Sequence, residues 1–94
     1  MTIEQIAVLG AVQWFKTYYQ GMPNKAALVE RASVLWPIHG DEKSVKRVYG
    51  EAVDSCYHAG YLIRSLDGYF LSNAGNYLLF ISGRRLESLV QLIR

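Results

Sequence analysis

The chain has 94 residues, of which 51% are hydrophobic and 19% charged, so it can form one compact domain and does not have the composition of a disordered chain. Its net charge of +2 permits contact with nucleic acid but is far from that of a polycation. The single cysteine, Cys56, excludes an intrachain disulfide and favours the cytoplasm, and the N-terminal apolar run is too short and too polar to be a signal peptide or a membrane span.

The N-terminal segment predicts a helix from Ile3 to about Tyr19. Thr2 and Gln5 have the spacing of a capping box, in which each side chain accepts a free backbone N–H of the other residue. The helix carries two apolar stripes, Ile3, Ile6, Ala7, Gly10 and Trp14 on one side and Val8, Val12, Phe15 and Tyr19 on the other. A helix that is apolar on two sides is usually buried on two sides, so we expect one side to face its own domain and the other a second subunit.

Two further helices follow, each with a polar residue at its start. Asn24 is a suitable cap for a helix over Lys25 to about Leu35, and Asp41 for a helix that runs to about His58 and is closed by Gly60. The loop between them contains Pro37.

The third helix divides into two faces. The 3–4 spacing predicts a core face of Val45, Val48, Ala52, Cys56 and Ala59. The opposite, polar face consists of Lys43, Arg47, Gly50 and Asp54, flanked by Lys46, Glu51 and His58.

Beyond the third helix, the sequence predicts a hairpin and a last helix. Asp67-Gly68 lies between two runs rich in aromatic and branched residues, which indicates a two-residue turn with positive φ at both positions. Ser72 is a suitable cap for a helix over residues 73–94, whose narrow apolar seam suits another helix and consists of Leu79, Ser82, Leu86, Leu89 and Ile93.

The stretch "SVKRVYGEAVDSCYHAGYLIRSLDGYFLSNAG" resembles the recognition helix and wing of prokaryotic or phage winged helix-turn-helix regulators. In that family a helix ends in Gly-Leu-Ile-x-Arg, here residues 60–64, and Leu-Thr-x-x-Gly opens the next helix, here residues 71–75. The resemblance covers about residues 24–80. It implies an α+β, mainly α winged-helix domain over residues 1–94, with a helix-turn-helix and wing in 24–72 and additional helices in 1–22 and 73–94.

The resemblance also implies that the third helix enters the major groove of double-stranded DNA. The residues expected to contact DNA are Lys25, Lys43, Lys46, Arg47, Gly50 and Arg64. The alternative is a solvated helix face, with Lys46 and Arg47 paired to Glu51 and Asp41, and Arg64 paired to Asp67 or Glu51. Homodimer contacts are expected at Val8, Val12, Phe15, Tyr19, Leu79, Leu86, Leu89 and Ile93.

Catalysis finds little support in the sequence. His39 and His58 have no carboxylate at metal-ligand spacing, Ser72 reads as a helix cap, and there is no glycine-rich phosphate loop. We therefore expect no enzyme activity, metal or cofactor.

The leading hypothesis is a dimeric transcriptional regulator that binds DNA. The alternative is a winged-helix module that binds a protein, such as a phage or mobile-element protein that modulates host machinery.

Overall fold

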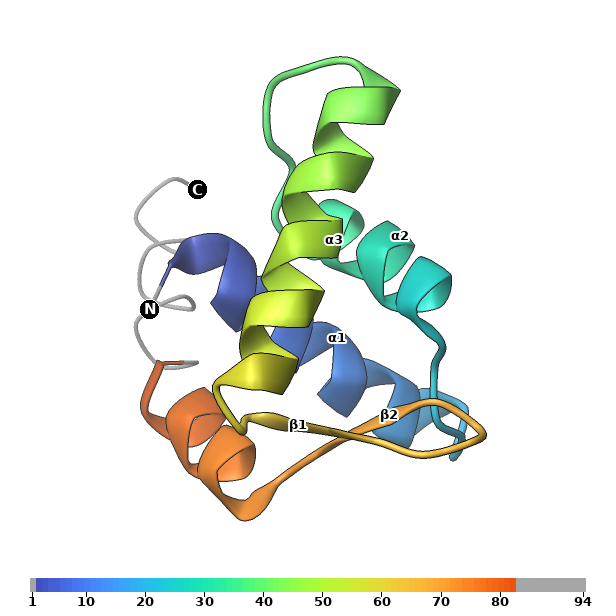
Figure 1. Ribbon diagram of the computed structural model, residues 1–94, viewed down its shortest axis with the longest axis vertical. Coiled ribbons are helices and arrows are strands. Elements are labelled where there is room, and N and C mark those ends of the chain that lie inside the picture. Colours follow the sequence, from blue (N-terminus) through green and yellow to red (C-terminus); the bar gives the residue numbers. More distant parts are fainter. Residues whose placement is uncertain (1, 83–94) are drawn as a thin grey trace.

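The computed structural model describes residues 2–82, in which three helices are followed by a two-stranded antiparallel hairpin and one further helix (Figure 1). The elements are α1 (Ile3–Tyr18), α2 (Lys25–Leu35), α3 (Glu42–His58), β1 (Leu62–Arg64) and β2 (Tyr69–Leu71), and residues 73–82 are again helical. The chain is therefore α+β and mainly α, as the sequence predicts.

The three predicted helix starts are confirmed by their caps. Thr2 and Gln5 form the capping box, with the Thr2 N–H donating to Gln5 Oε1 at 2.8 Å and the Gln5 N–H donating to Thr2 Oγ1 at 3.2 Å. Asn24 and Asp41 each accept the backbone N–H three residues further on, both at 2.8 Å. Hydrogen bonds from Ser44 lower the pKa of the Asp41 carboxyl, and the bond from the Ser44 backbone has a larger effect than the bond from its side chain.

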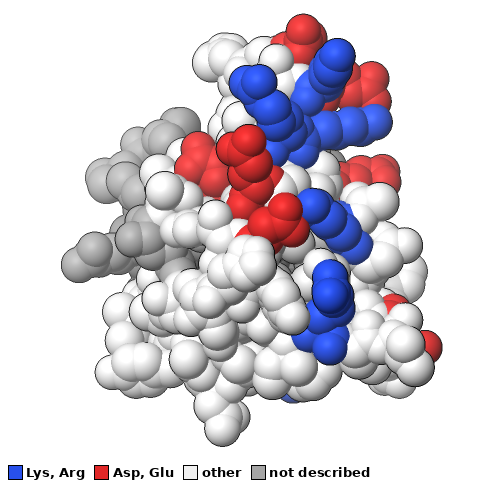
Figure 2. All heavy atoms as spheres, in the orientation of Figure 1, with Lys and Arg blue, Asp and Glu red and all other residues white. Residues whose placement is uncertain are grey.

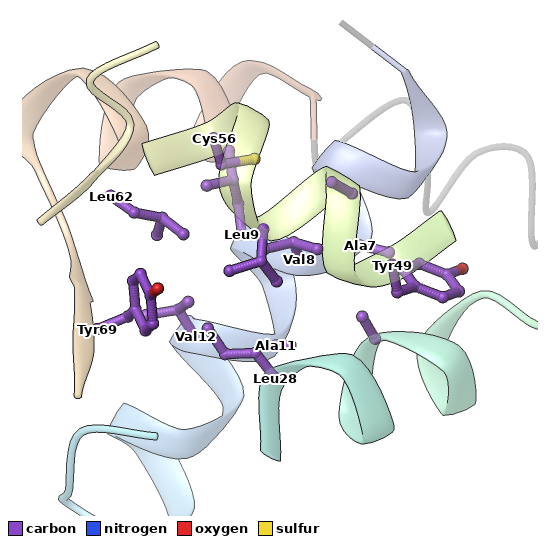
Figure 3. Close-up of a cluster of buried hydrophobic side chains, with 13 residues drawn as sticks. Ala7, Val8, Leu9, Ala11, Val12, Leu28, Tyr49, Cys56, Leu62 and Tyr69 are labelled. Atoms are coloured by element: carbon purple, nitrogen blue, oxygen red, sulfur yellow. The ribbon is translucent and has the colours of Figure 1, made fainter. Parts of the chain in front are cut away.

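Helix α1 lies at the centre of the fold and packs against α2, α3 and β2. Figure 3 shows its side chains meeting those of the other helices and the hairpin in one core. Val8 and Val12 are 0% and 4% exposed, so both are used inside their own domain. The expectation that they face a second subunit is wrong, because the hairpin and two helices together cover both sides of α1. The core residues are Ala7, Val8, Leu9, Ala11, Val12, Leu28, Ala32, Tyr49, Ala52, Val53, Cys56, Leu62 and Tyr69.

The core face of α3 is rotated relative to the predicted face. Tyr49 and Val53 are fully buried, whereas Val45 and Val48 are half-buried and Ala59 is exposed. The Tyr49 hydroxyl donates to the Trp36 carbonyl, so the ring can be buried without leaving its polar atom unpaired. The sequence pattern misses this because the acceptor lies in the loop before α3.

The hairpin turn differs from the predicted one. Leu62, Ile63 and Arg64 pair with residues 71, 70 and 69, and Ser65 exchanges backbone hydrogen bonds with Gly68. The turn therefore centres on residues 66 and 67, one position earlier than expected. Asp67 is not at positive φ, while Gly68 has φ +150°.

Two glycines allow backbone segments to approach closely. A Cβ on Gly68 would lie 2.5 Å from the Pro23 carbonyl oxygen, because the Tyr69 N–H donates to that oxygen and holds the hairpin against the α1–α2 linker. A Cβ on Gly75 would overlap the carbonyl oxygen of Tyr61. The expected Ser72 cap is confirmed there, because its hydroxyl accepts the Gly75 N–H at 3.0 Å.

We expect Gly75→Ala to lower the free energy of unfolding by about 3 kcal/mol, because the added methyl group collides with backbone that cannot rotate away. Gly10→Ala is the matched control: its Cβ would lie 3.7 Å from Leu35 Cδ1, an ordinary contact, inside helix α1. That change should be neutral or raise stability by roughly 0.5–1 kcal/mol. Urea unfolding followed by circular dichroism measures both. Equal effects of the two changes would contradict the close approach at Gly75.

Candidate nucleic-acid interface

An open groove of about 1080 Å³ separates the outer faces of α2 and α3. The groove is formed because the core side chains of the two helices converge on α1, so their polar faces diverge toward solvent. Its lining residues are Lys25, Ala26, Val29, Glu30, Ser33, Glu42, Val45, Lys46, Arg47, Gly50, Glu51 and Asp54. Four of the predicted DNA-contacting residues thus meet here, and Lys43 and Arg64 are outside the lining.

The first turns of α3 project beyond the rest of the fold (Figure 1). The hydrogen bond from the Tyr49 hydroxyl to the Trp36 carbonyl ties the preceding loop to this helix. Gly40, with φ +141°, then turns the chain into the Asp41 cap. Burial, and secondarily the charge of Glu4, raises the pKa of Tyr49 to about 12, so the hydroxyl keeps its proton in neutral solution.

The three basic side chains of this projecting segment differ in their surroundings. Lys46 Nζ lies 2.9 Å from Glu42 Oε1, one helical turn earlier, and both side chains are largely exposed. Lys43 and Arg47 are exposed, and neither has an ion-pair partner among residues 2–82. Lys46 thus forms a local ion pair on its own helix, as the alternative interpretation predicts, but its partner is Glu42 and not the expected Glu51. The expected pairing of Arg47 with Asp41 is absent, and Arg47 is an exposed side chain on this helix face.

Lys25 crosses the groove from the start of α2 to α3. Its Nζ lies 2.9 Å from Asp54 Oδ2, and the two side chains are 46% and 51% exposed. The Lys25 stem passes Gly50, with Cε 3.7 Å from where a Cβ at position 50 would be. The lysine therefore lies directly beside Gly50, one of the residues expected to contact DNA.

Arg64 lies on β1 with its guanidinium carbon 5.1 Å from the centre of the Tyr57 ring. This contact is a cation–π interaction, and the expected pairing of Arg64 with Asp67 or Glu51 is not present in the described part of the chain. Arg64 thus points to the C-terminal end of α3, away from the basic cluster at its start.

Charges on this face are mixed (Figure 2). Basic side chains gather over the start of α3 and continue below it, and acidic side chains lie directly beside them. The lining of the groove contains three basic residues and four acidic ones. The positive potential is therefore concentrated at Lys43, Lys46 and Arg47, and Glu51 and Asp54 make the later turns of α3 unfavourable for a phosphate.

The expected dimer residues have three different environments. Phe15 is half-buried against the core, and Tyr19 is 65% exposed in an aromatic cluster with Trp14, whose ring stacks under the Arg31 guanidinium at 3.6 Å. Leu79 is half-buried against the core. Leu86, Leu89 and Ile93 lie outside the described residues.

Three further features of residues 2–82 concern metal ligands, the cysteine and helix hydropathy. Between residues 2 and 82 no group of three His, Cys, Asp or Glu side chains is placed to hold a metal ion. Cys56 is buried, and burial raises its pKa to about 12, so the thiol keeps its proton in neutral solution. Over the same residues, no helix has both the length and the apolar character needed to cross a membrane.

No model of a known protein family matches this sequence, and no curated protein or solved structure is significantly similar to it.

We expect Tyr49→Phe to lower the free energy of unfolding by about 1–2 kcal/mol at neutral pH, because the Trp36 carbonyl loses its donor. The free energy of unfolding of the variant should also change less with pH in the alkaline range. The raised pKa of Tyr49 gives stability that is complete below about pH 10 and is lost as the pH rises toward 12, and Tyr49→Phe removes this contribution. Urea unfolding of both proteins between pH 7 and 11 measures the difference. Parallel pH profiles would show that the hydroxyl is solvated.

Proposed function

We propose that this chain is a small winged-helix DNA-binding protein that places the first two turns of α3 in the major groove and acts as a dimeric transcriptional regulator. The observation that carries the proposal is the position of Lys43 and Arg47. Both are exposed on a projecting helix end and have no carboxylate partner among residues 2–82. A free cation on a projecting helix can contact a phosphate, or the acceptor edge of a guanine, without first breaking an ion pair.

The carboxylates of α3 limit how deeply this helix can enter a groove. Glu51 and Asp54 follow the basic cluster by one to two turns and would face the phosphates if the whole helix lay along the groove floor. Docking by the N-terminal half keeps both at a distance. This geometry gives few phosphate contacts, so we expect modest affinity that falls steeply with salt.

Dimerisation extends the proposal. A dimer with two-fold symmetry would read two half-sites about one helical turn apart, which compensates for few contacts in each half. On the described chain the candidate surfaces are the aromatic cluster around Tyr19 and the outer side of helix 73–82, where Tyr77 and Ile81 are 65% and 43% exposed.

A protein-binding module is the second candidate, and the outer face of the hairpin favours it. The cross-strand pair Ile63 and Phe70 is 43% and 38% exposed, and Leu66 is fully exposed at the turn. A wing that contacts phosphates normally presents basic side chains, whereas exposed apolar side chains are typical of a protein contact. In this alternative, the hairpin is the contact surface and α3 has no ligand.

We expect Arg47→Gln to weaken binding to a labelled random duplex by about fivefold at low salt and to reduce the slope of log K against log salt by about 0.9. Fluorescence anisotropy across a salt series measures both quantities. Lys16→Gln is the charge-matched control, because Lys16 is exposed on α1 and does not line the groove. Its slope should equal that of the wild type. Absence of binding at low salt would refute the DNA-binding proposal and leave the protein-binding alternative.

We expect the full chain to sediment as a dimer and Ile81→Asp to shift it toward monomer, because a charge on the exposed side of helix 73–82 opposes burial against another apolar surface. Sedimentation equilibrium at several concentrations measures the association constant. Glu4→Gln, on α1, serves as a control that should leave it unchanged. A monomer at all concentrations would refute the dimer.

A further inference from the structure

The ion pair between Lys25 and Asp54 joins the two helices that border the groove. Lys25 is the first residue of α2, and Asp54 lies on the polar face of α3, three turns after the basic cluster begins. The 2.9 Å contact is between ends of side chains that are each about half exposed. Lys25 is thereby held over Gly50, at the edge of the same groove that Arg47 and Lys46 line.

Such a pair can open readily. Ion pairs with this degree of exposure contribute little to stability, because solvent screens them and because ordering the two side chains has an entropic cost. The lysine stem is flexible, and its ammonium group can be directed to any anion within reach. A DNA phosphate is an acceptor of the same charge as the Asp54 carboxylate, so the two compete for one ammonium group.

We propose that Asp54 limits affinity for duplex DNA by holding Lys25, and that Lys25 becomes a phosphate-contacting residue when this ion pair opens. The inference rests on the proposed DNA-binding function and adds to it that Asp54 sets the affinity for DNA. Gly50 lies beside this ion pair, since a Cβ at position 50 would be in ordinary contact, at 3.7 Å, with Lys25 Cε. Lys46 and Glu42 do not reproduce the arrangement, since both belong to α3 and their pairing leaves the groove open.

A double-mutant cycle in the full chain tests this proposal. The proteins are the wild type, Asp54→Asn, Lys25→Gln and the double variant, each titrated against a labelled random duplex by anisotropy over a salt series. We expect Asp54→Asn to tighten binding about fivefold and to steepen the salt slope by about 0.9, the equivalent of one added phosphate contact. In the Lys25→Gln background the same change should tighten binding less than about twofold. Glu4→Gln, which alters the net charge equally on α1, controls for general charge.

Three other results would overturn the proposal. An equal gain from Asp54→Asn with and without Lys25 would mean that the carboxylate acts by repelling DNA directly. No gain from Asp54→Asn, with normal binding by the wild type, would mean that the ion pair does not compete with phosphate. Absence of binding by both the wild type and Asp54→Asn would overturn the DNA-binding function itself, which separates that failure from the other two. Thermal unfolding of each variant identifies any loss of folded protein.

Discussion

The burial of helix α1 is the constraint on which the other elements depend. This helix packs against α2, α3 and β2, and five of its residues, from Ala7 to Val12, are almost inaccessible to solvent. Because α2 and α3 both turn their apolar residues toward it, their polar faces point outward and form the groove. The hairpin closes the remaining side, held by the hydrogen bond from the Tyr69 N–H to the Pro23 carbonyl. The placement of the four candidate DNA contacts that line the groove follows from this packing.

The outer surface carries its charges in two arrangements with different consequences. Lys25 and Lys46 are paired with carboxylates at 2.9 Å, so a ligand phosphate must replace an existing partner at each of them. Lys43 and Arg47 have no such partner among the described residues. A surface of this kind favours anions at one end of α3 only. The attraction of such a surface for an anion depends on the neighbouring carboxylates as much as on the number of lysines and arginines.

Individual elements show how far sequence reasoning reaches. The caps at Thr2, Asn24 and Asp41 are correct to the residue, because a cap is decided by neighbours only three positions away. The core face of α3 is only partly correct. Ala52 and Cys56 are buried as predicted, but Tyr49 was not expected there, because its burial depends on a carbonyl supplied by another segment. The hairpin turn is likewise shifted, because contact between Gly68 and the α1–α2 linker decides which residues occupy it.

From local chemistry alone, the sequence determines the mainly α composition, the bounds of the three helices and the presence of a hairpin after α3. It also places Lys43, Lys46 and Arg47 near one helix end. Tertiary structure alone decides that Val8 and Val12 are core residues, that Lys25 pairs with Asp54 and that Arg64 stacks on Tyr57. These contacts join residues of different elements, and no spacing rule within one element encodes them, because their distances are set by how the elements pack around α1.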